Sequence, residues 1–258
     1  MPERDLALLV EAARLAGRVA LQFWGKSPQV WDKPDGQGPV TEADLAVNAA
    51  LEDLLRTARP DYGWLSEESP DTADRLSCDQ VFIIDPIDGT RAFIGHDPGF
   101  SHSLAIARQG VVTAAVVYLP ARNRLYAARA GTTATRDAGP VQVAERDQVE
   151  GATLLISKAD LAEAHWIGRP PQVTRVFRPS LAHRLCLVAD GTFDGLLTLR
   201  PTWEWDIAAG ALITERAGAT LTDRRGAAVQ FNRAIPMTDG LLVASPGLHG
   251  RIAPLLKR

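Results

Sequence analysis

The chain has 258 residues, of which 46% are hydrophobic and 23% charged, and its formal net charge is −3. This composition is typical of a folded globular protein, and the slightly negative charge speaks against a binder of nucleic-acid polymers, which needs a basic surface. No apolar run reaches the roughly 18–20 residues of a membrane span, and the two cysteines form no CxxC pair, so we expect a reduced, cytoplasmic protein.

The first half of the chain is predicted to contain two helices followed by a set of strands. Apolar residues repeat at helical spacing over residues 3–24 and again over 41–58, which predicts two amphipathic helices. The glycines and prolines of residues 25–40 predict a loop between them. Residues 60–80 are mostly polar. The predicted strands, of which the second and third form a hairpin, are 81–85, 101–108, 111–119 and 124–129.

In the second half, strands and helices alternate. Residues 131–150 are polar and irregular, so we predict a boundary there between two subdomains, residues 1–135 and 136–258. Beyond it the predicted strands are 153–157, 173–177, 195–199, 218–222 and 240–245, and the predicted helices are 180–190, 205–217 and 247–257. This order predicts a layered α/β or α+β fold.

The stretch "DPIDGT" (85–90) places two carboxylates at the end of a buried strand. Ligand sites of layered α/β folds lie at such strand ends. Asp85 and Asp88 repel one another and stay ionised only beside a cation, and oxygen ligands suit magnesium. Thr90 can cap a following helix, whose N-terminus suits a phosphate. One alternative is a structural turn with Asp88 as a helix cap. Another is the nucleophilic Asp of haloacid-dehalogenase-like phosphatases, whose DxDGT signature has one residue fewer between the acids.

Three further stretches carry acidic residues. In "PVTEAD" (39–44), Thr41 and Asp44 are spaced like a capping box at the start of a helix. The pair Glu67 and Glu68 in "LSEES" is by itself typical of a solvated surface. In "WEWD" (203–206), Asp206 begins a helix of small residues, as an acid favoured by the helix dipole or as a metal ligand.

Taken together and in this order, the four stretches resemble the inositol monophosphatase superfamily. Its pattern is a T-x-x-D helix start, an E-E pair, D-P-[IL]-D-G-T and a late W-D-x-A-A-G, and the resemblance covers nearly the whole chain. It implies an αβαβα sandwich and hydrolysis of small phosphomonoesters that depends on two or three Mg²⁺ ions and is often inhibited by lithium. Many such relatives are dimers, so a homodimer is possible.

The resemblance also implies roles for individual residues. The implied metal ligands are Glu67, Asp85, the backbone carbonyl of Ile87, Asp88 and Asp206. Asp44 and Thr90 would orient the attacking water, with Glu67 beside them in the catalytic set. The backbone N–H groups of Gly89 and Thr90 would hold the phosphate, so the residues from Ile87 to Thr90 and Asp206 would also border the substrate. Most ligands fall in the first predicted subdomain, and Asp206 falls in the second.

Two departures bear on the substrate. Leu199 stands where inositol phosphatases have a glutamate that binds inositol hydroxyls. "RPTWEWD" instead resembles the G-P-T-x-x-W-D of bacterial 3′(2′),5′-bisphosphate nucleotidases, with Arg200 in place of the glycine. Residues 180–191 also resemble a pattern of the same group, G-S-x-x-K-x-C-x-V-A-x-G, and Arg184 stands in place of its lysine. Arg184 would then face a second phosphate, or it is a solvated charge on a helix.

The expected activity is therefore removal of the 3′-phosphate of 3′-phosphoadenosine 5′-phosphate. Inositol 1-phosphate or another small sugar or alcohol phosphate, such as histidinol phosphate, is the alternative, and a non-catalytic phosphate binder is a third. The tryptophans near Asp206 would stack on an adenine or fill the core. In the loop 25–40, Lys33 and Asp35 resemble a K-x-D pattern that would lie near the phosphate or a third metal.

Overall fold

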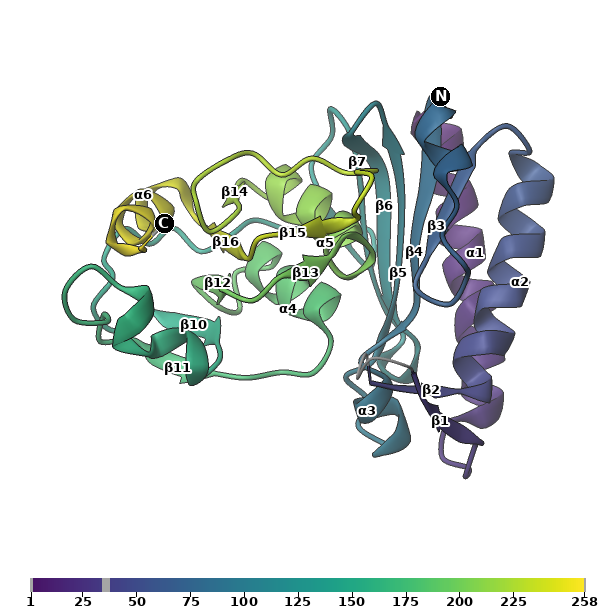
Figure 1. Ribbon diagram of the computed structural model, residues 1–258, viewed down its shortest axis with the longest axis horizontal. Coiled ribbons are helices and arrows are strands. Elements are labelled where there is room, and N and C mark those ends of the chain that lie inside the picture. The colour runs from purple at the N-terminus through teal and green to yellow at the C-terminus, as the bar shows by residue number, and fades with distance from the viewer. Residues whose placement is uncertain (1, 34–37, 258) are drawn as a thin grey trace.

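Helices and sheets alternate in five layers (Figure 1). The computed structural model describes residues 2–33 and 38–257. The layers run from α1 (Pro2–Phe23) and α2 (Glu42–Ala58), through a large sheet, to α4 (Leu181–Ala189) and α5 (Glu204–Arg216), then a smaller sheet and α6 (Pro246–Ile252). The predicted αβαβα sandwich is confirmed. None of the described helices combines the length and apolar character that crossing a bilayer requires.

The large sheet has seven strands that lie side by side in sequence order. They are β3 (Gly63–Ser66), β4 (Gln80–Asp88), β5 (Ser101–Arg108), β6 (Val111–Leu119), β7 (Arg124–Arg129), β8 (Thr135–Arg136) and β9 (Gly139–Pro140). β3 and β4 are parallel, and all other neighbours are antiparallel. The predicted hairpin and the strand after it are confirmed as β5, β6 and β7. The sequence did not predict β3, because it is short and lies in a polar region.

The smaller sheet has five strands in the order β11, β10, β12, β16, β14. Their bounds are β10 (Thr153–Ile156), β11 (Thr174–Val176), β12 (Gly195–Thr198), β14 (Thr220–Thr222) and β16 (Leu241–Ala244). β10 is parallel to both of its neighbours, and β16 is antiparallel to both of its own. All five correspond to predicted strands. The division into two subdomains stays a prediction, and β8 and β9 extend the large sheet beyond residue 135.

Several short elements connect these layers. The predicted loop 25–40 contains β1 (Val30–Asp32), which pairs antiparallel with β2 (Pro39–Thr41), while residues 34–37 lie outside the described parts. β13 (Thr202–Trp203) pairs with β15 (Met237–Thr238), and α3 (Thr90–Ile94) follows β4. The 3₁₀ turns are η2 (Ala73–Ser77), η3 (Pro120–Arg122), η4 (Ala159–Leu161), η5 (Glu163–His165) and η6 (Ala253–Leu255). The predicted last helix is shorter than expected, because Pro254 cannot donate the hydrogen bond that α6 would need to continue.

Successive side chains of one strand pack into two different hydrophobic cores. In β4, Phe82 and Ile84 pack with α1 and α2, whereas Val81 and Ile83 pack with α4 and α5. A third core lies between the smaller sheet and α6. This alternation follows from the two-residue period of a strand, and each fully buried aliphatic side chain contributes about 1.5–3 kcal/mol. The large sheet is therefore anchored on both faces, and the ends of its strands are held in place.

Gly210 allows α4 and α5 to pack closely, and it provides a test of this middle layer. A Cβ at position 210 would lie 2.4 Å from Cδ1 and 2.5 Å from Cβ of Leu185. We expect Gly210→Ala to lower the free energy of unfolding by about 1–3 kcal/mol, measured by chemical denaturation. The matched control is Gly250→Ala in α6, where a Cβ meets nothing within 4 Å. Its higher helix propensity should leave stability unchanged or raise it. Equal stability of the two variants would contradict the close packing.

Candidate active site

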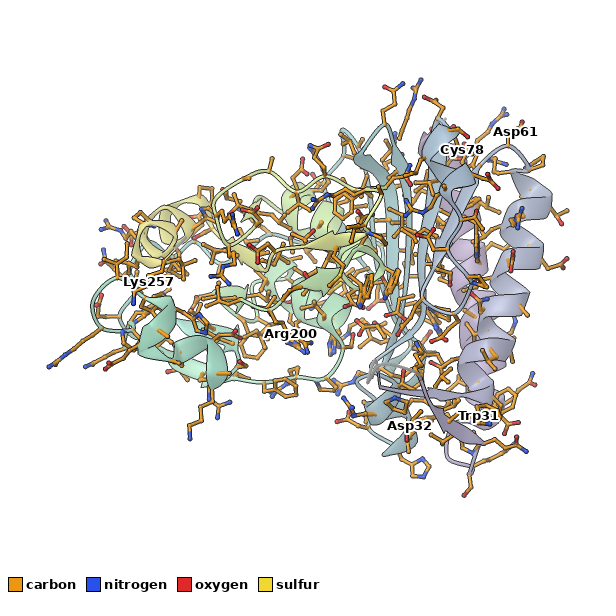
Figure 2. All side chains as sticks on the ribbon, viewed as in Figure 1. Trp31, Asp32, Asp61, Cys78, Arg200 and Lys257 are labelled. Carbon is orange, nitrogen blue, oxygen red and sulfur yellow. The ribbon has the colours of Figure 1, made fainter. Side chains whose placement is uncertain are left out.

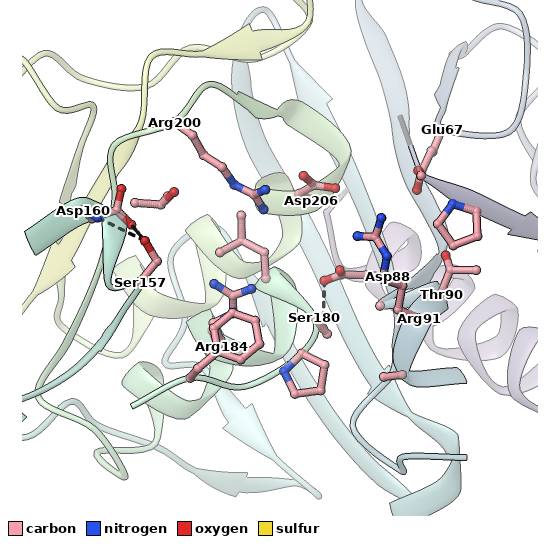
Figure 3. A pocket seen from close by; sticks show the side chains of 18 of the residues that line it. Glu67, Asp88, Thr90, Arg91, Ser157, Asp160, Ser180, Arg184, Arg200 and Asp206 are labelled. Atoms are coloured by element: carbon pink, nitrogen blue, oxygen red, sulfur yellow. Dashed lines mark hydrogen bonds between the residues drawn. The ribbon is translucent and has the colours of Figure 1, made fainter. Parts of the chain in front are cut away.

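A pocket of about 520 Å³ opens where the ends of β3 and β4 approach α4, α5 and β12. Figure 3 shows Glu67, Asp88 and Arg91 on one side of it and Arg184, Arg200 and Asp160 on the other. Asp206 lies between the two groups. The pocket thus takes residues from both sheets and from the helices packed between them.

Three carboxylates converge beside this pocket. One oxygen each of Glu67, Asp85 and Asp206 lies within 4.8 Å of the others. The parallel register of β3 and β4 pairs Ser66 with Ile84, so the residues that follow each of them, Glu67 and Asp85, are brought side by side. Asp206 arrives from the first turn of α5. The structure therefore brings together three of the residues that the sequence predicted as metal ligands.

The crowding of these acids changes their electrostatics. Burial, followed by repulsion from Glu67 and the neighbouring aspartates, raises the pKa of Asp85 well above its ordinary value. The pKa of Asp206 is raised by burial and by the charges of Asp88 and Glu67. Within the described parts of the chain, the buried Oδ1 of Asp85 has no hydrogen-bond partner. A set of oxygen donors with an unsatisfied buried oxygen and mutual repulsion fits a hard divalent cation.

Lys33 supplies one positive charge at the edge of this cluster. Its Nζ lies 2.6 Å from a carboxylate oxygen of Glu67 and 2.6 Å from one of Glu68. Burial alone would lower the pKa of Lys33, but the two carboxylates raise it overall. Burial and the charge of Glu67 raise the pKa of Glu68 to about 7. Lys33 is thus placed against Glu67, while its predicted partner Asp35 lies outside the described residues.

Asp44 and Thr90 form a hydrogen-bonded unit on the same side. The predicted capping box is confirmed, since Oδ2 of Asp44 accepts from the N–H of Thr41 at 2.9 Å and from its hydroxyl at 2.6 Å. Oγ1 of Thr90 lies 3.3 Å from Oδ1 of Asp44 and 3.2 Å from the carbonyl oxygen of Ile87. Burial raises the pKa of Asp44 to about 6, although the hydrogen bonds from Thr41 oppose that rise.

Asp88 has a different environment from the other three acids. Its Oδ2 accepts from the hydroxyl of Ser180 at 2.8 Å and from the N–H of Ala182 at 2.6 Å, which joins the turn to the start of α4. Burial raises the pKa of Asp88, and the Ala182 N–H opposes that rise. Its role as a metal ligand stays a prediction. Because Oδ2 is engaged, the ligand atom would be Oδ1.

The expectation that Thr90 caps the following helix is wrong. Gly89 is the N-cap residue of α3 and Thr90 is already helical. Gly89 has a φ of 94°, a conformation that favours glycine, and a Cβ there would lie 3.3 Å from the backbone of Ser180. The alternative with Asp88 as the cap is wrong for the same reason.

His102 was not predicted, yet it supports the same turn. It is fully buried in β5, and its Nδ1 is hydrogen-bonded to the carbonyl oxygen of Pro86. Burial lowers the pKa of His102 to about 4, so the ring is neutral at pH 7 and Nδ1–H donates to that carbonyl. No local sequence pattern connects His102 with "DPIDGT", because their contact depends on the pairing of β4 with β5.

The other end of the pocket contains residues that the sequence did not predict as site residues. Arg200, Phe177, Asp160 and Ser157 line it together with the predicted Arg184. They come from separate segments that only the smaller sheet brings together. The guanidinium carbon of Arg184 lies 4.7 Å from the centre of the Phe177 ring.

Other residues named in the sequence do not reach the pocket. Leu199 is buried in the core between the smaller sheet and α6. Trp203 and Trp205 stack on each other with ring centres 4.6 Å apart and pack in the core around α5, so they fill the core.

Comparisons with known proteins agree with this geometry. The chain matches the model of the "Inositol monophosphatase family" over residues 1–258. It is 33% identical to the 3′(2′),5′-bisphosphate nucleotidase CysQ of Escherichia coli K12, over 80% of this chain and 85% of the relative. It is 31% identical to an inositol-1-monophosphatase of Rhizobium meliloti, over 82% of each chain.

Among solved structures, the IMPase of Thermotoga maritima superposes with a TM-score of 0.82 and 27% identity, over 98% of this chain and 96% of that one. That agreement extends over both sheets and the helices between them. The converging carboxylates are thus part of a fold shared with phosphatases along its whole length. We conclude that the chain belongs to the inositol monophosphatase family of metal-dependent phosphatases.

Proposed function

We propose that this phosphatase removes the 3′-phosphate of 3′-phosphoadenosine 5′-phosphate with the help of Mg²⁺. The observation that carries the choice of substrate is the position of Leu199. Its side chain is 4% exposed and packs toward α6, so no carboxylate from this position is available to bind the hydroxyls of a polyol. The adjacent Thr198 and Arg200 line the pocket instead.

The names of the relatives support the same choice without excluding the alternative. CysQ proteins of several enterobacteria match at 29–33% identity, and their name describes a bisphosphate nucleotidase. Inositol-1-monophosphatases match at 31%. Because the two groups are nearly equally similar, identity alone does not choose between them. The side chains in the pocket therefore carry the argument.

We assign Mg²⁺ to the acidic end of the pocket. Its proposed ligands are Glu67, Asp85, Asp88, Asp206 and the carbonyl of Ile87. When bound, the metal would lower the pKa of a water molecule and stabilise charge on the phosphate. Hard carboxylate and carbonyl oxygens are the ligands that Mg²⁺ prefers, and a divalent ion offsets the repulsion that raises the pKa of Asp85 and Asp206.

Asp44 and Thr90 are proposed to orient the attacking water. The Thr90 hydroxyl has one proton, which it donates to either Asp44 or the carbonyl of Ile87, so a lone pair of its oxygen is left to accept from water. Asp44 is fixed by Thr41 and cannot turn away. Its pKa of about 6 lets it stay largely ionised at neutral pH and still accept a proton. The backbone N–H groups of Gly89 and Thr90 would hold the phosphate.

The metal assignment predicts how Asp206→Asn changes stability. The folded-state pKa values of Asp85 and Asp206 lie above the unfolded values near 4, so the folded, metal-free protein binds more protons. Its free energy of unfolding therefore falls as pH rises above about 4. Removing one of the repelling charges should raise the melting temperature in EDTA at pH 8, by roughly 2–4 °C for each kcal/mol gained. This gain in melting temperature should be smaller at pH 5. In Mg²⁺, the Asp206→Asn variant should lose most of its phosphatase activity.

The control for this experiment is Asp61→Asn, which removes the same charge from an exposed position far from the pocket (Figure 2). The melting temperature is measured by calorimetry in EDTA and in Mg²⁺. We expect Mg²⁺ to raise it for the unmodified protein and for Asp61→Asn, and to raise it less for Asp206→Asn. A lower melting temperature of Asp206→Asn at pH 8, or equal stabilisation of all three by Mg²⁺, would contradict the assignment.

A substrate panel tests the proposed reaction itself. Phosphate release is measured with Mg²⁺, with and without lithium, from 3′-phosphoadenosine 5′-phosphate, inositol 1-phosphate and histidinol phosphate. We expect the adenosine bisphosphate to have the highest kcat/KM and lithium to inhibit its hydrolysis. A much higher kcat/KM for inositol 1-phosphate would overturn the choice of substrate. Binding of the bisphosphate without phosphate release would favour a non-catalytic phosphate binder.

A further inference from the structure

The strand that pairs with the acidic turn begins with three buried polar residues. Ser101, His102 and Ser103 open β5, none of them has exposed surface, and apolar residues follow them as far as Ala107. Burying a polar side chain is unfavourable unless it is hydrogen-bonded. The alternation of a strand turns the two serines toward the core around α4 and α5, and the histidine toward the core around α1 and α2. The polar triplet, residues 101–103, thus serves both faces of the large sheet.

His102 lies opposite an irregularity in the pairing of β4 with β5. Between the paired residues on either side, β4 has two residues, Pro86 and Ile87, where β5 has only His102. Such a bulge interrupts the hydrogen-bond ladder, and Pro86 has no N–H with which to pair. The Nδ1–H of His102 donates to the carbonyl of Pro86 inside the bulge. Because the next carbonyl, that of Ile87, is a proposed metal ligand, His102 fixes the peptide that leads to it.

The other ring nitrogen of His102 bears on why a histidine stands here. Its Nε2 is buried and has no hydrogen-bond partner among the residues that the structure describes. A buried polar atom without a partner is destabilising. A leucine would fill this core without that cost, but it could not donate to Pro86. What the histidine adds, compared with an aliphatic residue, is therefore the donor to the turn.

Ser103 connects the segments of two proposed metal ligands. Its backbone pairs with Asp85 in the β4–β5 ladder. Its hydroxyl donates to the carbonyl of Trp205 at 2.9 Å, and Trp205 directly precedes Asp206. The first turn of α5 is thus tied to the strand that lies beside Asp85.

Ser101 reaches the segment of a third ligand through Ser180. The Oγ atoms of the two serines lie 2.9 Å apart. Ser180 has one hydroxyl proton, which it donates to Oδ2 of Asp88 at 2.8 Å, so Ser101 is the donor within the serine pair. Ser101 therefore fixes the hydroxyl group that holds Asp88.

We propose that Ser101, His102 and Ser103 are positioning residues for the Mg²⁺ site, because each of them holds one ligand-bearing segment and all three lie on the same strand. The inference rests on the proposed function and names residues behind the ligands rather than further ligands. Polar groups in such positions orient metal ligands, and their loss typically weakens metal binding roughly 10- to 100-fold. The polar triplet should therefore set the affinity of the site for Mg²⁺.

The first test is the Kd of the full chain for Mg²⁺, measured by titration calorimetry after the protein has been freed of metal with EDTA and dialysed. We expect His102→Leu to raise this Kd roughly 10- to 100-fold, because the turn loses its donor. His102→Asn should stay closer to the unmodified protein, since the asparagine amide can place an N–H where the histidine has its Nδ1–H. The melting temperature in EDTA reports the stability of each variant separately.

A matched pair of variants separates positioning from packing. Ser103→Ala removes the hydroxyl that bonds the first turn of α5. Thr214→Val removes another buried hydroxyl, which lies 2.8 Å from the carbonyl of Gly210 and 2.9 Å from that of Ala211, near the other end of the same helix. Both variants lose a buried hydrogen bond and should be somewhat less stable in EDTA. Only Ser103→Ala should raise the Kd for Mg²⁺.

The dependence of activity on Mg²⁺ gives a second readout. Phosphate release from 3′-phosphoadenosine 5′-phosphate is measured over a range of Mg²⁺ concentrations. For His102→Leu we expect the half-saturating Mg²⁺ concentration to rise with the Kd, and saturating Mg²⁺ to restore most of kcat. A variant that is merely less stable would have a lower kcat at every Mg²⁺ concentration and an unchanged half-saturating concentration. That result for His102→Leu would overturn the inference.

The outcomes separate this inference from the proposed function. If the unmodified protein binds Mg²⁺ and cleaves the bisphosphate, but His102→Leu and Ser103→Ala leave the Kd unchanged, the positioning role is overturned and the proposed function stands. An equal rise of the Kd in Thr214→Val would also overturn it. If the Kd values shift as expected but the bisphosphate is not cleaved, the choice of substrate is wrong and the positioning role stands. If the unmodified protein binds no Mg²⁺, both fail.

Discussion

Three carboxylates, from Glu67, Asp85 and Asp206, lie within 4.8 Å of one another, and the surrounding structure has to hold them there. Such a group is unfavourable in isolation, because burial and mutual repulsion oppose its ionisation, and the raised pKa values of Asp85 and Asp206 express that cost. Of these three acids, Glu67 forms an ion pair with Lys33 at 2.6 Å, and Lys33 shares its charge with Glu68. The acids therefore remain close only because the elements that carry them cannot move apart.

Those elements are held together across the layers. Asp85 lies inside a strand buried on both faces, whereas Asp206 belongs to a helix that begins about 120 residues later. The hydroxyl of Ser103 in β5 donates to the carbonyl of Trp205 at 2.9 Å, directly beside Asp206. The carboxylate of Glu204, the first residue of α5, accepts from the backbone N–H groups of Asn232 and Arg233. The close packing of α5 between the two sheets thus brings Asp206 next to Asp85, although the two residues are far apart in the sequence.

Sequence reasoning found the acidic end of the site, because its residues carry local patterns. Asp85 interrupts an apolar strand, and Asp44 completes a capping box, so each is unusual where it stands. Arg200, Phe177 and His102 were missed as site residues, since each depends on a tertiary contact that no neighbouring residue signals. The helices and most strands follow from periodicity, whereas β3 is too short to show one. The partnership of Asp88 with α4 likewise depends on how the layers meet.

The pocket keeps opposite charges close without neutralising them. Arg200 and Arg184 lower the pKa of Asp206 against the stronger effects of burial, Asp88 and Glu67, yet no ion pair within 4.0 Å forms with either arginine in the described residues. The crowded carboxylates at the acidic end repel a phosphate, and a bound divalent cation would remove that repulsion. Metal binding should therefore decide whether a phosphate group can enter the acidic end of the pocket.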